Sequence, residues 1–215
     1  MGLLTGVGQG LMNLIFPEEC WMCGAEIVSA GALIPLCSLC ENELWSLPKE
    51  RCPRCGKINL KRASARTLCR ECQSGARRFD SAVSVYIYAG TFRKIWHHVK
   101  FSKHPEWIPA LVDSALEKIG PDEQFNPYLF DVYTWVPTTD GRKSERGFDP
   151  AEEIAKRLAD KFKRPILPLL QRIRDCRPQF ELSRAERIKN VEAAFAANLP
   201  KDMRTRAALL VDDIL

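Results

Sequence analysis

Cysteine is the residue type that stands out in this 215-residue chain: nine are present, and eight of them form four CxxC pairs. Thirteen residues separate the first pair from the second, and thirteen separate the third from the fourth. The chain therefore repeats one unit, CxxCG followed by twelve residues and CxxC, over residues 20–40 and 52–72. In both copies a glycine follows the second cysteine, where a positive φ lets backbone N–H groups point at the sulfur atoms.

Four thiolates supplied by two such pairs suit a tetrahedral zinc ion. Pairing in sequence order closes each repeat on itself and predicts two structural zinc sites, with crossed pairing as the alternative. The predicted ligands are Cys20, Cys23, Cys37 and Cys40 in one site and Cys52, Cys55, Cys69 and Cys72 in the other. A disulfide scaffold would need an oxidising compartment, and an iron–sulfur cluster would use the same thiolates. The N-terminus has no Lys or Arg ahead of its apolar residues, unlike a secretory signal peptide, so we expect a cytoplasmic protein.

Charge is distributed unevenly along the chain. The formal net charge is +5, but two zinc ions held by eight thiolates bring it to about +1, so net charge alone does not indicate nucleic-acid binding. Residues 49–78, however, hold ten Lys or Arg against two Glu. Such a basic ribbon can contact phosphates, and we predict Arg62, Arg66 and Arg70 as DNA contacts. The alternative is a solubilising surface on a domain with little core.

Strand and helix patterns alternate after residue 78, which predicts an α/β domain with a mostly parallel sheet. We therefore expect two domains, a double ribbon at 1–78 and an α/β domain at 79–215. Expected strands are 82–89, 131–136, 166–170 and 207–211, the last buried on both faces. Expected helices are 3–15, 41–47, 91–101, 106–119, 150–163 and 184–194. No run approaches the roughly 18–20 apolar residues of a membrane-spanning helix.

Two segments outside the ribbons carry residues suited to ligand binding. Asp212 and Asp213 follow an apolar strand, and acids at the carboxyl edge of an open sheet can grip a diol or a metal ion. The loop at 136–150 contains Arg142, Lys143, Arg146 and Gly147 and leads into a helix start, an arrangement that favours anions. The alternatives are an acidic turn and a solvated loop.

Taken together, these features resemble the ComF family of competence-associated proteins with a phosphoribosyltransferase-like domain. The resemblance covers roughly residues 10–215. It rests on the segment from Leu11 to Cys20, the double ribbon, Lys100-Phe101, Val136-Pro137, RxxxRGF from Arg142 to Phe148, and LVDD at 210–213. An intervening stretch matches at Arg174, Gln179, Leu182, Ser183, Arg187, Asn190, Ala194 and Phe195.

The resemblance implies a type I phosphoribosyltransferase fold. Asp212 and Asp213 would bind the ribose hydroxyls of 5-phosphoribosyl-1-diphosphate (PRPP), Mg²⁺ would accompany the ligand, and the 142–147 loop would meet its pyrophosphate. The implied function is handling of single-stranded DNA during natural transformation, together with competence helicase or recombination proteins. The alternatives are a PRPP-dependent transferase with an unknown acceptor and an inactive truncated fragment.

The sequence departs from the family pattern in two places. RGFNQ is replaced by Arg146-Gly147-Phe148-Asp149-Pro150, which puts an acid beside the expected anion site. The chain also stops at Leu215, where the phosphate loop is expected. We therefore expect an incomplete transferase domain that is catalytically inactive and has an unprotected edge exposing Leu209 and Val211.

Overall fold

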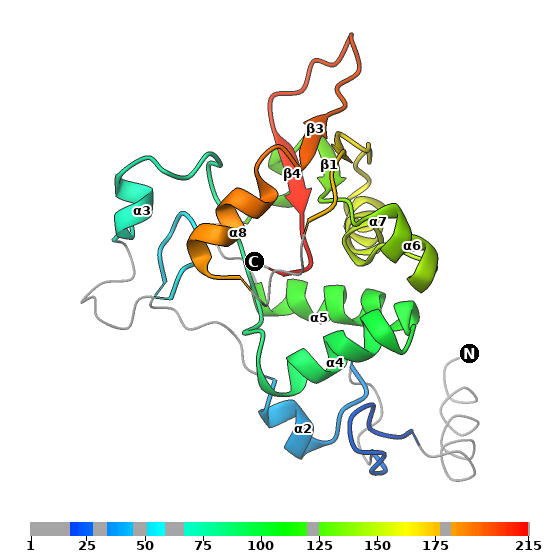
Figure 1. Cartoon of the computed structure of the whole chain (residues 1–215). Helices are drawn as coiled ribbons and strands as arrows, with labels where there is room; N and C mark the ends of the chain where they lie inside the picture. Colours follow the sequence, from blue (N-terminus) through cyan, green and yellow to red (C-terminus); the bar gives the residue numbers. More distant parts are fainter. Residues whose placement is uncertain are drawn as a thin grey trace, which may run out of the picture. The chain divides into compact units, whose positions relative to one another are not determined.

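A computed structural model describes residues 18–27, 34–44, 51–58, 67–119, 125–176 and 182–214 (Figure 1). The chain divides into two compact units. Unit 1 comprises Met1–His98 and Asp113–Phe125, and unit 2 comprises Val99–Val112 and Asn126–Leu215. The division therefore falls within the two helices α4 (Gly90–Phe101) and α5 (Ile108–Ile119). The boundary expected at residue 78 from composition alone stays a prediction.

The first CxxC pair of each repeat folds into the same tight turn. Gly24 N–H donates to the Cys20 carbonyl and Gly56 N–H to the Cys52 carbonyl, both at 2.9 Å. Both glycines have φ +69°, a conformation that L side chains rarely adopt, so the glycine after each pair has the positive φ that the sequence predicts. The repeat in the sequence is thus a repeat in the backbone.

The second CxxC pair of each repeat starts a short helix. These helices are α2 (Ser38–Asn42) and α3 (Arg70–Gln73). The carbonyls of Cys37 and Cys69 accept the first helical hydrogen bonds, from Glu41 and Gln73, both at 2.9 Å. The helical turn expected at 41–47 therefore begins earlier, at Ser38, directly after Cys37. Residues 45–47 and the helix expected at 3–15 lie outside the described residues.

The strand expected at 82–89 is wrong, because the segment forms only a single bridge at Tyr86. Its backbone instead bonds to the second ribbon: Ala82 N–H donates to the Arg54 carbonyl at 2.7 Å, and the Ser84 carbonyl accepts from Arg51 at 3.2 Å. The alternating pattern identified an extended segment, but the ribbon satisfies polar groups that a sheet would otherwise pair.

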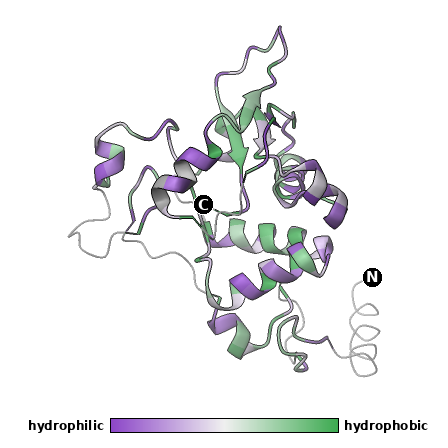
Figure 2. Ribbon diagram, in the orientation of Figure 1, coloured by the Kyte–Doolittle hydropathy of each residue, from purple (hydrophilic) through white to green (hydrophobic). Residues whose placement is uncertain are grey.

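Helices α4 and α5 confirm the predictions at 91–101 and 106–119. A 3-10 turn, Pro105–Trp107, precedes α5. On α4 the residues Ile95, Trp96 and Val99 are buried at helical spacing. Figure 2 shows the resulting apolar and polar faces along both helices.

The centre of unit 2 is a small parallel sheet. Strand β1 (Val132–Trp135) pairs in parallel with β4 (Ala208–Val211), and Tyr133 forms a further parallel bridge to Ile166. Helix α7 (Pro150–Phe162) follows β1 and packs against both strands (Figure 1). This confirms the predicted strands at 131–136 and 207–211, the helix at 150–163 and the parallel α/β character.

A second, antiparallel pair joins β2 (Leu170–Arg172) to β3 (Phe195–Ala197). The strand expected at 166–170 is interrupted: Ile166 forms a single bridge, Leu170 begins β2, and Pro168 between them lacks a backbone donor. The three residues of β3 were not predicted, because so short and alanine-rich a strand has no periodic pattern. Helix α8 (Arg184–Val191) confirms the turn expected at 184–194, and a 3-10 turn covers Pro127–Leu129.

Three expectations about unit 2 are corrected. The loop expected at 136–150 contains a helix, α6 (Asp140–Arg146), because the Thr139 side chain caps its start. Strand β4 is not buried on both faces, since Ala208 is exposed and Leu210 is 51% exposed. Val211, expected to be exposed, is buried, and Leu209 is half-buried. Within the described part of the chain, no helix is long and apolar enough to cross a membrane.

Candidate functional site

The eight paired cysteines gather into two groups of four. Within each group the Sγ atoms lie within 4.8 Å of one another, which confirms pairing in sequence order over crossed pairing. Cys23 Sγ lies 3.6 Å from Cys37 Sγ, and in the second group the corresponding pair is also 3.6 Å apart. We call these groups the first zinc site (Cys20, Cys23, Cys37 and Cys40) and the second zinc site (Cys52, Cys55, Cys69 and Cys72).

Both groups fit a zinc ion. Zinc–sulfur bonds of 2.3 Å in a tetrahedron place the sulfur atoms about 3.8 Å apart, close to the 3.6 Å observed. In the second site Cys69 N–H donates to Cys52 Sγ at 3.3 Å. Against the opposing effect of burial, backbone hydrogen bonds of this kind lower the pKa of Cys20 and Cys52 to about 6. In each site one cysteine thus favours the thiolate form that binds metal, whereas burial and the neighbouring thiols raise the pKa of Cys40 and Cys72 to about 12.

The disulfide alternative does not describe this structure. All nine cysteines are free, and a sulfur–sulfur separation of 3.6 Å is well beyond the bonded length of about 2.05 Å. Cys176 belongs to neither group, and its thiol contacts the carbonyl oxygen of Asn190 at 3.0 Å. The chain therefore offers eight zinc ligands and one separate thiol.

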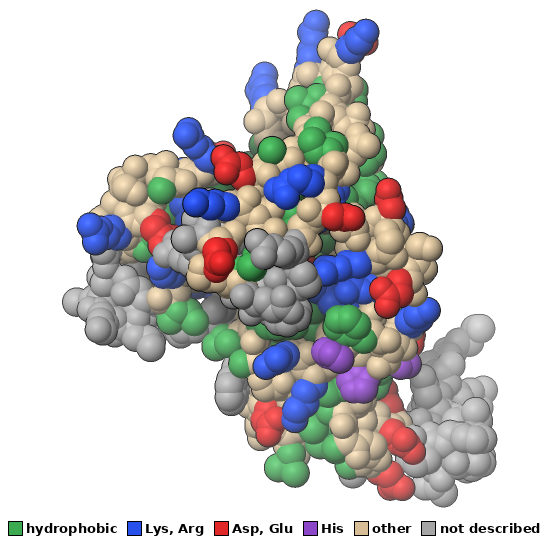
Figure 3. Space-filling view, in the orientation of Figure 1, with side chains coloured by type: hydrophobic (Ala, Val, Ile, Leu, Met, Phe, Trp, Pro, Cys, Tyr) green, Lys and Arg blue, Asp and Glu red, His purple; other side chains and the backbone are tan. Residues whose placement is uncertain are grey.

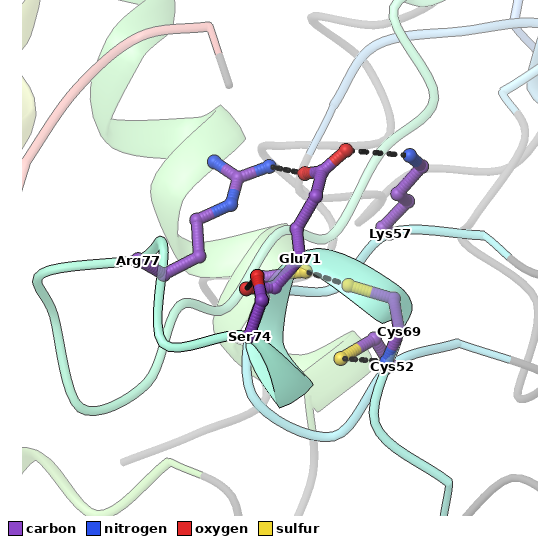
Figure 4. A network of polar contacts seen from close by, with 7 residues as sticks. Cys52, Lys57, Cys69, Glu71, Ser74 and Arg77 are labelled. Atoms are coloured by element: carbon purple, nitrogen blue, oxygen red, sulfur yellow. Dashed lines mark hydrogen bonds and ion pairs between the residues drawn. The ribbon is translucent and has the colours of Figure 1, made fainter.

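Positive side chains surround the second zinc site. Glu71, on α3, accepts from Lys57 at 3.2 Å and from Arg77 at 2.8 Å (Figure 4). Partial burial opposes ionisation of Arg77, but its hydrogen bond to Glu71 and the charges of Glu71, Cys55 and Cys72 raise its pKa. The Arg77 charge is therefore within electrostatic reach of the second zinc site.

Two further arginines fasten the second ribbon to the segment that follows it. Arg54 donates to the Phe79 carbonyl at 2.7 and 3.0 Å and to the Arg77 carbonyl at 3.3 Å. Arg51 donates to the Ser84 carbonyl. Four basic residues of the 49–78 segment are thus engaged within the protein, which the sequence alone did not reveal.

The first ribbon has the same backbone turns and different side chains. Met22 stands where the second ribbon has Arg54, Ala25 where it has Lys57, and Leu39, which is 77% exposed, where it has Glu71. No Lys or Arg occurs anywhere in residues 18–44, whereas five exposed Glu do: Glu18, Glu19, Glu26, Glu41 and Glu43. This difference is visible in the sequence, and counting charge over the first repeat would have found it.

The predicted DNA contacts separate into described and undescribed residues. Arg62 and Arg66 lie outside the described residues. Arg70 is exposed on α3, as is Arg78 beyond it, and neither side chain has an ion pair or hydrogen bond to the described part of the chain. Arg78 is therefore an available cation that the sequence prediction did not select.

The acids after β4 face a lysine of α4 within unit 2. Asp213 forms an ion pair with Lys100, whose side chain is only 14% exposed. Asp213 N–H also donates to the Asp212 carboxylate at 2.8 Å. Asp212 is exposed as a residue, but its carboxyl group lies among protein atoms. This partial burial and the adjacent charge of Asp213 raise the pKa of Asp212 to about 7. The two acids thus differ: Asp213 is ion-paired with Lys100, whereas Asp212 has a raised pKa.

The structure brings one of the predicted basic residues near these acids. Arg146 is half-buried with its guanidinium 5.2 Å from the centre of the Phe101 ring. Burial and the charge of Arg142 lower the pKa of Arg146, while the negative charge of Asp213 opposes that change. Arg146 therefore lies within electrostatic reach of Asp213. Arg142 is exposed, and Lys143 pairs with Glu152 at 2.6 Å.

The backbone donors expected at this loop are already used by the protein. Gly147 ends α6 with φ +85°, and its N–H donates to the Lys143 carbonyl at 2.8 Å. The Asp149 carboxylate is buried and accepts from Thr138 N–H at 2.8 Å and Ala151 N–H at 3.0 Å. The acid that departs from the family pattern therefore caps α7, occupying donors that an anionic ligand would use.

Comparison with known families matches only the ribbons. Residues 11–73 match the family model described as the double zinc ribbon domain. Neither a search of curated proteins nor one of solved structures found a match. A double zinc ribbon with two four-cysteine sites therefore precedes a mixed α/β region with a small parallel sheet.

Proposed function

We propose that the chain binds single-stranded nucleic acid through its second zinc ribbon. The observation that carries this proposal is the segregation of charge between the two repeats. Residues 18–44 contain five Glu and no Lys or Arg, whereas residues 49–78 contain ten Lys or Arg and two Glu. A phosphate backbone is attracted to the second repeat and repelled by the first.

Only part of the positive charge in the second ribbon is available to a ligand. Arg51 and Arg54 donate to backbone carbonyls, and Lys57 and Arg77 share Glu71. The exposed side chains of Arg70 and Arg78 remain, and Arg62 and Arg66 stay predicted contacts. In this proposal the phosphate contacts are Arg62, Arg66, Arg70 and Arg78. The other four side chains, Arg51, Arg54, Lys57 and Arg77, have a structural role.

The salt dependence of binding tests this assignment. Replacing Arg70 and Arg78 with Ala should weaken binding of a fluorescent single-stranded oligonucleotide. It should also flatten the slope of log affinity against log salt by about 0.7 for each lost contact. Binding would be measured by anisotropy at several salt concentrations. Unchanged affinity and slope would leave the basic ribbon as a solubilising surface.

A suitable control removes the same charge elsewhere. Lys201 and Arg204 are exposed in the loop between β3 and β4, which is drawn at the top of Figure 1, and Figure 3 shows blue side chains at that tip. Replacing both with Ala changes the net charge by the same amount. If this control lowers affinity as strongly as the ribbon variant, overall charge rather than the second ribbon governs binding.

The biological role we propose is the one implied by the ComF resemblance: handling of incoming single-stranded DNA in the cytoplasm during natural transformation. The double zinc ribbon at residues 11–73 supports this resemblance in part. Deleting the gene in a transformable host should reduce recovery of transformants while leaving uptake of labelled DNA at the surface intact. Transformation at the normal frequency would remove this role and leave the DNA-binding proposal standing.

A second candidate function is PRPP binding with Mg²⁺ and transfer to an unknown acceptor. The occupied donors around Gly147 and Asp149 count against it, and the end of β4 favours it. Its supporting observation is that Asp213 lies within electrostatic reach of Arg146, with Asp212 adjacent. Arg142, Lys143 and Gly147 complete the predicted ligand set. Titration of PRPP with Mg²⁺ by calorimetry should detect binding that Asp212→Asn with Asp213→Asn abolishes and Asp202→Asn, in the exposed loop, does not. Absence of heat in the unaltered chain would reject this candidate.

A further inference from the structure

We propose that the first zinc site is an oxidant-reactive site, in which Cys23 reacts first and zinc is released while the second zinc site keeps its metal. The reactant is a neutral oxidant of the peroxide class, which has access to an exposed thiolate. This proposal goes beyond nucleic-acid binding and does not depend on it. It rests on three differences between the two sites: access, surrounding charge and attachment to the rest of unit 1.

Access differs although the geometry of the sulfur atoms does not. The pairs Cys23–Cys37 and Cys55–Cys69 have the same 3.6 Å separation. Cys23 is exposed, whereas Cys55 at the equivalent position is half-buried. Cys37 and Cys40 are also half-buried, while their counterparts in the second site are 5% and 3% exposed. Oxidation of cysteine follows thiolate character and exposure, so the first site is the one an oxidant reaches.

Charge favours reaction at the same site. A zinc ion bound by four thiolates carries a net charge of −2, and forming a disulfide removes two of the thiolate charges. Glu19 and Glu41 lie next to ligands in the first site, in a segment without Lys or Arg. Oxidation removes negative charge near these two carboxylates, which lowers the electrostatic repulsion at the first site and favours the reaction. In the zinc-loaded protein all eight ligands are already thiolates, so nearby positive charge adds no further thiolate. Around the second site Lys57 and Arg77 instead lower the energy of the negatively charged site and oppose the loss of its charge (Figure 4).

Attachment to neighbouring segments also differs. Arg51 and Arg54 bind carbonyls of residues 77–84, and the Arg54 carbonyl accepts from Ala82. Opening the second site would break these bonds together. Among the described residues, the first ribbon has one such side-chain bond, from the Thr91 hydroxyl of α4 to the Glu43 carboxylate at 3.0 Å. Its backbone bonds, such as Trp21 N–H to the Pro35 carbonyl at 2.9 Å, stay within the described part of the ribbon. The first site can therefore lose its metal with less disruption of unit 1.

The chemical step balances with peroxide as the oxidant. The Cys23 thiolate attacks one peroxide oxygen, the O–O bond breaks, and a sulfenic acid and hydroxide form. The Cys37 thiolate then attacks the Cys23 sulfur and displaces a second hydroxide, which leaves a disulfide. Two sulfur atoms have each lost one electron, the peroxide has accepted two, and the hydroxides take protons from solvent to give water. The first site then keeps only the Cys20 and Cys40 sulfur ligands, too few to hold a structural zinc ion.

Zinc release from the full chain loaded with two zinc ions tests the proposal. Hydrogen peroxide is added in the presence of a chromogenic zinc chelator. We expect one zinc per chain to leave first and the second to leave about tenfold more slowly or not at all. Alkylation followed by peptide mass spectrometry should locate the first disulfide at Cys23 and Cys37. Release of both ions in one phase, or a first disulfide among Cys52, Cys55, Cys69 and Cys72, would overturn the proposal.

Two variants separate the proposed causes without removing a ligand. Arg77→Gln should speed the slow phase severalfold and leave the fast phase unchanged, whereas Glu41→Gln should slow only the fast phase. Cys176→Ser removes the thiol outside both sites and should change neither phase. If Cys176→Ser abolishes the fast phase, the reactive thiol is Cys176 and the assignment to Cys23 is wrong.

Discussion

The two zinc ribbons have the same backbone and opposite surroundings. Both begin with a turn in which a glycine at φ +69° returns its N–H to the first cysteine. In the second ribbon, Arg54 bonds this turn to the segment that follows the ribbon, and Lys57 links the turn to Glu71 of α3. The first ribbon has Met22, Ala25 and Leu39 at those positions. The cysteines and the glycine thus specify the turn in both ribbons, while the residues between the cysteines decide what each turn bonds to and which charge it presents.

Removing one ligand from each site should give the largest effect. Cys20→Ser and Cys52→Ser should each lower the zinc content from two to one per chain, since the sites are closed in sequence order. We expect the loss of thermal stability to be greater for Cys52→Ser, because Arg51, Arg54 and Ala82 tie that ribbon to the following segment. Elemental analysis and thermal unfolding would measure both. Loss of both zinc ions in either variant would show that the ribbons fold as one cooperative unit.

The next largest effect is a difference in stability cost between truncating Arg54 and truncating Met22, which occupy equivalent positions in the two ribbons. Arg54→Ala removes hydrogen bonds to two carbonyls and should cost about 1.5–3 kcal/mol in the free energy of unfolding. Met22→Ala, the same truncation at the matching position, removes only half-buried apolar surface and should cost about 1 kcal/mol. Urea unfolding of the zinc-loaded variants measures the difference. Equal costs would mean that the arginine bonds contribute no more than simple packing.

A smaller effect on stability is expected at the end of β4 in unit 2, where Asp212 and Asp213 lie side by side. The pKa of Asp212 is raised from 3.8 to about 7, so the folded state binds its proton more tightly than the unfolded state. This contribution to stability is present at low pH and is lost as pH rises from about 4 to 7. Asp212→Asn should therefore become more stable than the unaltered chain as pH rises, by about 1 kcal/mol at pH 8 after allowing for solvent screening. A stability difference independent of pH would contradict the shift.

The smallest effect concerns the ion-pair network of the second ribbon. Glu71→Gln should reduce stability by about 0.5–1 kcal/mol, since Lys57 and Arg77 remain partly solvated. In the first ribbon, Ala25→Lys with Leu39→Glu would place the same pair at the equivalent positions and should raise stability by a similar or smaller amount. Thermal unfolding at low and high salt would distinguish these electrostatic effects from packing. A Glu71→Gln variant as stable as the unaltered chain would make the network incidental.

Much of the ribbon region could be predicted from the sequence. Duplicated CxxC spacing leaves few ways to arrange eight thiolates, because four sulfur atoms must meet around one metal. The helices α4 and α7 and the strands β1 and β4 likewise have strong periodic patterns or continuous apolar runs. The glutamates of residues 18–44 were equally visible in the sequence, so the acidic nature of the first ribbon was a readable feature.

Tertiary structure decided which polar groups are available. The pattern at 82–89 was typical of a strand, but its backbone bonds to Arg51 and Arg54, partners distant in the sequence. Asp149 was expected beside an anion and instead caps α7. Lys100 was a motif residue without an assigned role until folding paired it with Asp213. Sequence thus determined the metal ligands, whose chemistry is local. The engagement of each charged side chain depends on long-range contacts, and that is why only the fold could decide it.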